Sequence, residues 1–260
     1  MDKASWPGAT ARGKREREMG LENGGGNRGD RDRGDAALEA VGVWVFDLDN
    51  TLYPASCDLF SLIERRMGAF IAERFGLSPE EARRRQKRFF REHGTTLRGL
   101  MVEHAVEPDE FLAYVHAIDL AALAPDPALG RALAALPGRK LVFTNASRDH
   151  AERVMARLGV AGQFEAIHDI ADAGYRPKPD PATYAGFLAR HGVDPARACM
   201  LDDMACNLVP AARLGMTTAW IRGDSAWGRP TADHLPHIHH VIDDLPGWLA
   251  KRAAPEGGEE

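Results

Sequence analysis

The sequence predicts an α/β protein in which a doubly wound parallel sheet carries an inserted, all-helical cap. Short apolar runs alternate with segments of helical periodicity along most of the chain, and this alternation is typical of a parallel sheet covered by helices. Between the first apolar run and the second, about a hundred residues later, only helical patterns occur. These two observations predict the core and the insertion.

Strands are predicted from the apolar runs. The first run, residues 41–46, is apolar throughout and rich in β-branched residues, which is typical of a strand buried on both faces of a parallel sheet. Further strands are predicted at residues 140–144, 164–168, 198–202, 217–222 and just before Ile242. Capping residues and apolar periodicity predict helices between them, at residues 148–158, 181–190 and 205–214.

The helical stretch divides the chain into a core and a cap. The predicted catalytic core comprises residues 39–54 and 126–250, and the predicted cap comprises residues 55–125. A cap inserted after the first strand lies above the carboxyl ends of the strands, where ligands bind in open α/β sheets. Helices are predicted near residues 97–105 and 108–117 within the cap, and near residues 127–136 directly after it.

Both ends of the chain are predicted to be disordered tails. Residues 1–38 are rich in glycine and in charges of both signs, with almost no large apolar side chains. Such a segment cannot bury enough apolar surface to offset the entropy cost of ordering it. The final residues, 251–260, are predicted to be disordered as well.

Composition and charge limit the classes of partner. The 260 residues carry a formal net charge of −5, which disfavours nucleic acid and anionic membranes as partners. No apolar run approaches the roughly 20 residues of a transmembrane helix, and the N-terminus lacks the apolar segment of a secretory signal. The three irregularly spaced cysteines indicate free thiols rather than disulfides or a zinc site. We therefore expect a cytoplasmic protein that binds neither nucleic acid nor membranes.

Polar residues that suit phosphate chemistry follow the predicted strands. Asp47 and Asp49 come directly after the first strand, and residues two apart on an extended chain project to the same side. Two carboxylates held together raise the pKa of one of them, a conflict that a divalent cation removes. The other strand ends and the loops after them supply Thr144, Asn145, Lys178, Asp202 and Asp203. Any one of these is more often a turn or capping residue, but their shared placement at strand ends indicates one site.

This set of motifs resembles the haloacid dehalogenase-like superfamily of phosphohydrolases. The resemblance rests on Asp47-Leu48-Asp49-Asn50-Thr51, Thr144-Asn145, Lys178 and Asp202-Asp203. It implies that Asp47 attacks phosphorus to give an aspartyl-phosphate, while Asp49 acts as general acid and then as general base. It further implies that Thr144 hydrogen-bonds the phosphoryl group and that Lys178 stabilises the charge on the nucleophile and the phosphate. Asn145 is expected to be a further substrate-binding residue.

The resemblance also implies a Mg²⁺ cofactor. The expected ligands are the Asp47 carboxylate, the Asp49 backbone carbonyl and Asp203. In the family a second Asp commonly follows this last ligand by about four residues and orients the lysine, but Asn207 stands there in this chain. Asp202 is therefore expected to be a further metal ligand or the partner of Lys178.

Residues 89–100 resemble the cap motif of the pyrimidine 5′-nucleotidase branch of this superfamily. The Asp-Asn-Thr-Leu-Tyr-Pro sequence at 49–54 is similar to that branch, as is Phe-Thr-Asn-Ala followed by His150. The resemblance implies a small phosphomonoester substrate, namely a pyrimidine nucleotide such as UMP or CMP, with Thr95 and Thr96 offering hydroxyls to its base or ribose. Thr95 is equally suited to be the N-cap of the helix that follows.

Three other functions are compatible with the fold. A dehalogenase of the same fold needs the nucleophile but neither a second acid nor a metal, so Asp49 speaks against it. A phosphatase for a sugar phosphate or another small metabolite differs only in the cap. A non-catalytic binding module would be expected to lack one of the charged groups, and none is missing here.

Overall fold

The computed structural model describes residues 38–223 and 228–253, which contain a six-stranded, wholly parallel sheet. The predicted α/β fold class is confirmed. Most of the two predicted tails, residues 1–37 and 254–260, lies outside the described residues. The strands are β1 (Val43–Phe46), β2 (Arg139–Phe143), β3 (Ala166–His168), β4 (Ala198–Asp202), β5 (Thr217–Ile221) and β6 (His240–Ile242).

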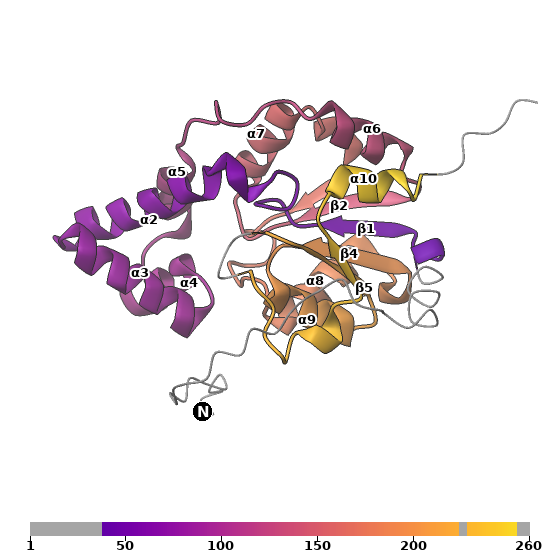
Figure 1. The fold of residues 1–260 in the computed structure, drawn as a ribbon. Helices are drawn as coiled ribbons and strands as arrows, with labels where there is room; N and C mark the ends of the chain where they lie inside the picture. The colour runs from indigo at the N-terminus through magenta and orange to yellow at the C-terminus, as the bar shows by residue number, and fades with distance from the viewer. Residues whose placement is uncertain (1–37, 224–227, 254–260) are drawn as a thin grey trace, which may run out of the picture.

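Helices cover both faces of the sheet (Figure 1). Side chains alternate between the faces, so Trp44 and Phe46 belong to one hydrophobic cluster while Val43 and Val45 belong to the other. The first face is covered by α6 (Pro127–Ala135), α7 (Arg148–Leu158) and α10 (Leu245–Ala250), and the second by α8 (Pro181–His191) and α9 (Ala205–Arg213). Single 3-10 turns connect some of these elements: η2 (Ala161–Gln163), η3 (Pro195–Arg197) and η4 (Leu235–His237).

The strand order β3-β2-β1-β4-β5-β6 contains one reversal of direction. The chain runs outward from β1 to β3 and then returns to place β4 on the other side of β1. Ligands of open α/β sheets bind at such a reversal, beyond the carboxyl ends of the strands. The amide of Asp47 donates a hydrogen bond to the carbonyl of Leu201 at 2.9 Å, so the ends of β1 and β4 lie side by side at this point.

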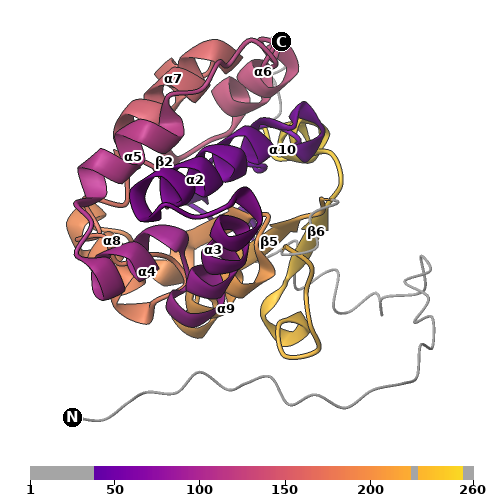
Figure 2. The same cartoon turned by 90° about the vertical axis from the view of Figure 1, so that its left-hand side faces the viewer.

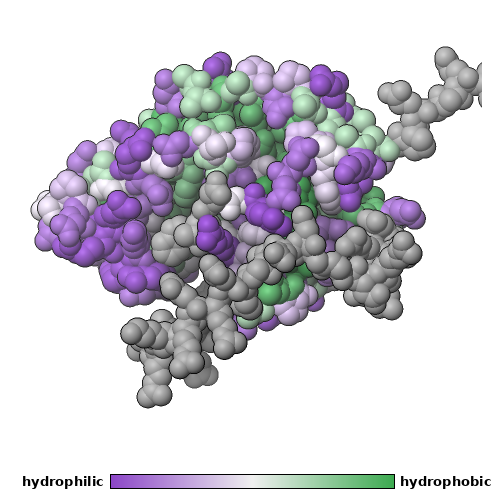
Figure 3. Space-filling model, viewed as in Figure 1, coloured by the Kyte–Doolittle hydropathy of each residue, from purple (hydrophilic) through white to green (hydrophobic). Residues whose placement is uncertain are grey.

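A helical insert, residues 55–116, follows β1. Its four helices pack on one another, and in Figure 2 they lie in front of the sheet. Inside the insert, the rings of Phe70 and Phe111 meet edge to face at 5.2 Å, while its outer surface in Figure 3 is largely hydrophilic. The insert consists of η1 (Ala55–Cys57), α2 (Leu59–Phe75), α3 (Pro79–His93), α4 (Thr96–His104) and α5 (Pro108–His116). None of the helices in the described part of the chain is long and apolar enough to cross a membrane.

Candidate active site

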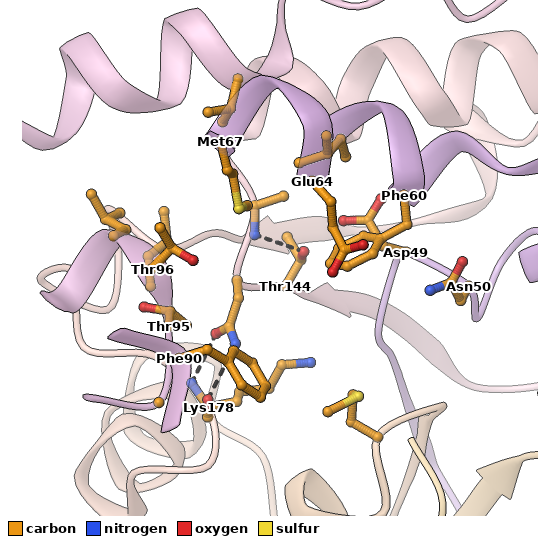
Figure 4. A pocket seen from close by; sticks show the side chains of 18 of the residues that line it. Asp49, Asn50, Phe60, Glu64, Met67, Phe90, Thr95, Thr96, Thr144 and Lys178 are labelled. Atoms are coloured by element: carbon orange, nitrogen blue, oxygen red, sulfur yellow. Dashed lines mark hydrogen bonds between the residues drawn. The ribbon is translucent and has the colours of Figure 1, made fainter. Parts of the chain in front are cut away.

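A cavity of about 400 Å³ lies between the carboxyl edge of the sheet and the helical insert. Its size falls within the range of small-molecule sites. Figure 4 shows polar side chains from the sheet edge facing apolar and hydroxyl side chains from the insert. The sheet side is lined by Asp47, Asp49, Thr144, Asn145, Lys178 and Asp203, and the insert side by Phe60, Glu64, Met67, Phe90, Thr95 and Thr96.

Lys178 joins the ends of three strands at the floor of this cavity. Its Nζ donates hydrogen bonds to Asp47 Oδ1 at 2.8 Å, to the Phe143 carbonyl at 2.7 Å and to Asp202 Oδ2 at 2.8 Å. Only 1% of Lys178 is exposed. Burial by itself lowers the pKa of Lys178, but the attraction of Asp202 and Asp47 outweighs burial and raises it. The ammonium group therefore stays charged and compensates the two buried carboxylates.

Asp202 is committed to hydrogen bonds within the protein. Besides Lys178, its carboxylate accepts from the Met204 amide at 2.8 Å and from Asn207 Nδ2 at 3.0 Å to each oxygen. The Asp202 side chain is fully buried. Both of its oxygens thus have donors, and its position fixes the ammonium group of Lys178.

Asp203 lies beside this cluster with its carboxylate unpaired among the described residues. Its backbone is held at both ends, because its amide donates to Thr51 Oγ1 at 3.1 Å and its carbonyl accepts from Trp220 Nε1 at 2.8 Å. Burial, reinforced by repulsion from Asp202 and Asp47, raises the pKa of Asp203 well above its ordinary value. Burial, opposed by Lys178 and reinforced by Asp202, also raises the pKa of Asp47.

These carboxylates fit a divalent cation. One oxygen each of Asp47, Asp202 and Asp203 lies within 4.8 Å of the others, and such oxygen donors suit Mg²⁺. Burial, reinforced by repulsion from Asp202, raises the pKa values of Asp47 and Asp203, and a bound cation would favour their charged forms. Because both oxygens of Asp202 already accept hydrogen bonds, Asp47 and Asp203 are the carboxylates best placed to bind the ion.

Asp49 occupies a different environment from Asp47. Its Oδ1 accepts hydrogen bonds from Tyr53 Oη at 2.6 Å and from His150 Nε2 at 3.0 Å. Burial raises the pKa of Asp49, but the attraction of His150 and the two hydrogen bonds outweigh burial and lower it. Neither Tyr53 nor His150 is among the residues for which the sequence predicts a role in the site. The signal that could have indicated Tyr53 is its short separation of four residues from Asp49.

Thr144 and Asn145 face the cavity in different ways. Thr144 Oγ1 accepts from the Ala146 amide at 3.0 Å, which leaves its hydroxyl hydrogen available to a ligand. The side chain of Asn145 instead bonds the backbone of Lys178, accepting from its amide at 2.8 Å and donating to its carbonyl at 3.2 Å. Asn145 therefore holds the lysine loop in place at the cavity wall.

Thr95 and Thr96 both line the cavity, at the start of α4. Thr95 is the N-cap of this helix, because its Oγ1 accepts from the Arg98 amide at 3.1 Å. Thr96 begins the helix and is 5% exposed. Of the two, Thr96 has the hydroxyl that the helix end does not use.

The fold and this edge of buried carboxylates around a lysine define an α/β protein with a site at the carboxyl ends of its strands. The family model for haloacid dehalogenase-like hydrolases matches residues 42–215. The chain therefore belongs to the haloacid dehalogenase-like hydrolase family.

The chain is also similar to one curated protein in sequence and to several solved structures in fold. Phosphate metabolism protein 8 of Saccharomyces cerevisiae is 30% identical over 192 residues, which are 67% of this chain and 59% of the yeast protein. The chain thus spans less than two thirds of that relative's length. Among solved structures, a HAD phosphatase from Thermococcus onnurineus has a TM-score of 0.53 at 20% identity, covering 78% of this chain and 93% of its own. A dehalogenase with an intermediate complex has a TM-score of 0.52 at 18% identity, covering 83% and 99%. Both likenesses show the fold alone.

Proposed function

We propose that this chain is a Mg²⁺-dependent phosphomonoester hydrolase that acts through an aspartyl-phosphate on Asp47. The observation that carries the proposal is a pair of carboxylates, Asp47 and Asp49, that line one cavity in opposite environments. Asp47 is paired with a buried lysine, whereas Asp49 is held by Tyr53 and His150. Two carboxylates that line one cavity and are held by different partners can divide the work of nucleophile and proton donor.

The residues divide the reaction as follows. Asp47 attacks phosphorus through a carboxylate oxygen while the bond from phosphorus to the leaving oxygen breaks, and Asp49 donates its proton to that oxygen. A water molecule then attacks the phosphorus of phospho-Asp47, Asp49 takes the water's proton, and free phosphate leaves. The Thr144 hydroxyl can donate to a phosphoryl oxygen. Lys178, whose three hydrogens are donated within the protein, stabilises Asp47 and the phosphoryl group through its charge.

Asp47 and Asp203, with the backbone carbonyl of Asp49, are the proposed ligands of Mg²⁺. The ion supplies a positive charge that neutralises the phosphoryl group during transfer. Asp202 is not a proposed ligand of the ion, because both its oxygens already accept hydrogen bonds. Its role is to hold the ammonium group of Lys178 in place. A dehalogenase would need neither the ion nor Asp49.

We propose a pyrimidine nucleoside monophosphate, such as UMP or CMP, as the substrate. Residues 55–125 act as the cap in this proposal. The insert offers two aromatic side chains, Phe60 and Phe90, on which a base can stack, and the hydroxyl of Thr96 for its polar edge. The name of the yeast relative, a phosphate metabolism protein, supports phosphate chemistry without specifying a substrate.

A phosphate-release screen tests the proposal directly. The full chain is assayed on UMP, CMP, AMP and ribose 5-phosphate, with Mg²⁺ and with a chelator. We expect release from UMP and CMP only with Mg²⁺, and loss of release in Asp47→Asn. Asp243→Asn is a matched control, because Asp243 is an exposed aspartate outside the cavity. Release from ribose 5-phosphate in preference to UMP would support a sugar phosphatase, and no release from any ester would contradict the proposal.

A further inference from the structure

The carboxylate of Asp49 is held through one of its two oxygens. Oδ1 accepts both hydrogen bonds, from Tyr53 and from His150. Within residues 38–223 and 228–253, no hydrogen bond to Oδ2 accompanies them. Since Asp49 lines the cavity, the two oxygens of this carboxylate are chemically distinct.

His150 is fixed by the start of α7. It is the third residue of this helix, and its amide donates to the N-cap, Ser147 Oγ, at 3.4 Å. The ring is fully buried, and its Nδ1 has no hydrogen-bond partner among the described residues. A buried N–H without a partner is costly, so we assign the ring hydrogen to Nε2, which donates to Asp49.

His116 supports the ring of His150 from the helical insert. The two rings are stacked, with centroids 4.4 Å apart and planes 16° apart. Burial lowers the pKa of His116 to about 3, so this neighbour is a neutral ring at neutral pH.

His116 is in turn fixed to α7. Its Nδ1 lies 2.8 Å from Ser147 Oγ, and Arg153 donates hydrogen bonds to the carbonyls of His116 and Ile118, both at 2.9 Å. The end of α5 is thereby attached to the first turns of α7. His150 is enclosed between this end and Asp49.

We infer that His150, supported by His116, is a positioning residue that determines which oxygen of Asp49 exchanges the proton. This inference rests on the proposed phosphatase function. Two donors at Oδ1 make it the carbonyl oxygen of the protonated acid, so the hydrogen resides on Oδ2. Oδ2 gives this proton to the leaving oxygen as the bond to phosphorus breaks. It later accepts a proton from the water that attacks phospho-Asp47. His150 keeps its own proton in both steps.

Leaving groups of different basicity test this inference. An alkoxide from UMP or ribose 5-phosphate needs a proton to leave, whereas the nitrophenolate of p-nitrophenyl phosphate leaves without one. His150→Phe keeps a ring against His116 but removes the donor. We expect kcat/KM for the alkyl esters to fall by about 10²-fold, and kcat/KM for the aryl ester to fall far less. Because kcat/KM covers only the steps up to departure of the leaving group, slow hydrolysis of phospho-Asp47 does not obscure the comparison.

Three further variants separate positioning from general damage. His150→Gln places an amide N–H near the position of Nε2 and should restore most of the alkyl-to-aryl ratio. Tyr53→Phe removes the other donor to Oδ1 without touching α7, so it should lower the ratio even if His150→Phe fails to fold. His168→Phe alters another buried histidine, 2% exposed and without a contact to Asp49, and should leave the ratio as in the wild type.

The outcomes distinguish the inference from the function on which it rests. Equal losses on both classes of ester in His150→Phe and Tyr53→Phe, or no loss in either, overturn the inference while the active wild type upholds the function. A wild-type chain that hydrolyses none of the esters with Mg²⁺ overturns the function and the inference together.

Discussion

At the scale of single residues, Asp202 and Asn207 determine how Lys178 is held. Asn207 stands where the resemblance leads one to expect a second aspartate. Lys178 pairs with Asp202 instead, and the amide of Asn207 donates to both oxygens of Asp202. In this chain the Asp202 carboxylate holds Lys178, and the Asn207 amide holds that carboxylate in place.

Replacing Asn207 by Asp should destabilise the protein. The change removes the amide donor from a buried carboxylate and adds a second negative charge beside it, which we expect to cost about 1–3 kcal/mol. Urea unfolding without Mg²⁺ measures this cost. The double variant Asp202→Asn/Asn207→Asp keeps one amide and one carboxylate, so it should recover most of the stability. If Asn207→Asp alone unfolds like the wild type, the pairing does not stabilise the fold.

Asp203 and Asp202 should differ in their effect on the Mg²⁺ requirement. Asp203 is unpaired among the described residues, whereas Asp202 is saturated with donors. We expect Asp203→Asn to raise the Mg²⁺ concentration for half-maximal activity by at least about tenfold. Asp202→Asn should mainly lower kcat, because Lys178 loses a partner. A magnesium titration of both variants checks this, and the reverse ranking would move the metal site toward Asp202.

The candidate site residues could be named from the sequence, but some of the contacts between them could not be predicted. Asp47, Lys178 and Asp203 could be placed together because the carboxyl ends of parallel strands meet at one edge. The contact of His150 with Asp49 joins residues 101 positions apart, and it depends on how α7 packs, which no local pattern specifies. Asn145 was expected to bind substrate, but its amide meets the backbone of a loop 33 residues away.

At the scale of elements, the helices of the insert follow local signals closely. Helices predicted near residues 97–105 and 108–117 begin and end within one residue of those bounds in α4 and α5. The same holds for α6 of the core, which was predicted near residues 127–136. Proline and capping residues determine such ends. Their packing partners could not be predicted, because contacts between helices depend on residues far apart in the sequence.

Two helical glycines should respond oppositely to alanine. A Cβ at Gly99 in α4 would come within 2.5 Å of the Phe89 side chain in α3, whereas a Cβ at Gly130 in α6 has nothing within 4 Å. Gly99→Ala should therefore destabilise the chain by about 1–3 kcal/mol through overpacking. Gly130→Ala should stabilise it by about 0.4–1 kcal/mol. Thermal and urea unfolding measure both changes, and stabilisation by Gly99→Ala would contradict the described contact of α3 with α4.

Substitutions at Thr95 and Thr96 should have different effects: at Thr95 on the stability of the protein, and at Thr96 on its preference among substrates. Thr95→Ala removes the N-cap of α4 and should cost about 0.5–2 kcal/mol, while Thr95→Ser retains the cap. Thr96→Val keeps the shape but removes the hydroxyl, so it should change kcat/KM for UMP more than for p-nitrophenyl phosphate. Equal losses on both esters would show that Thr96 has a structural role only.

At the scale of the whole molecule, the site depends on one reversal of strand order. The alternation of apolar runs and helical patterns was sufficient to predict a doubly wound parallel sheet. The strand order β3-β2-β1-β4-β5-β6 could not be predicted from the sequence, because it depends on which strands pair with strands far away in the sequence. This order brings β1 and β4 together and so places Asp47, Asp202 and Asp203 within reach of Lys178. The insert then closes the cavity from above the strand ends.

Identification of a phosphorylated side chain tests the central claim most directly. The full chain is mixed with UMP and Mg²⁺, quenched in acid, digested and analysed by mass spectrometry, with Asp49→Asn included to slow hydrolysis of the intermediate. The Asp49→Asn variant is loaded with p-nitrophenyl phosphate, because this ester needs no proton from residue 49 to form the intermediate. We predict one phosphoryl group on Asp47, labile to hydroxylamine as an acyl phosphate must be, and no such group in Asp47→Asn. Steady phosphate release without any phosphorylated Asp47, together with undiminished turnover in Asp47→Asn, would contradict the account.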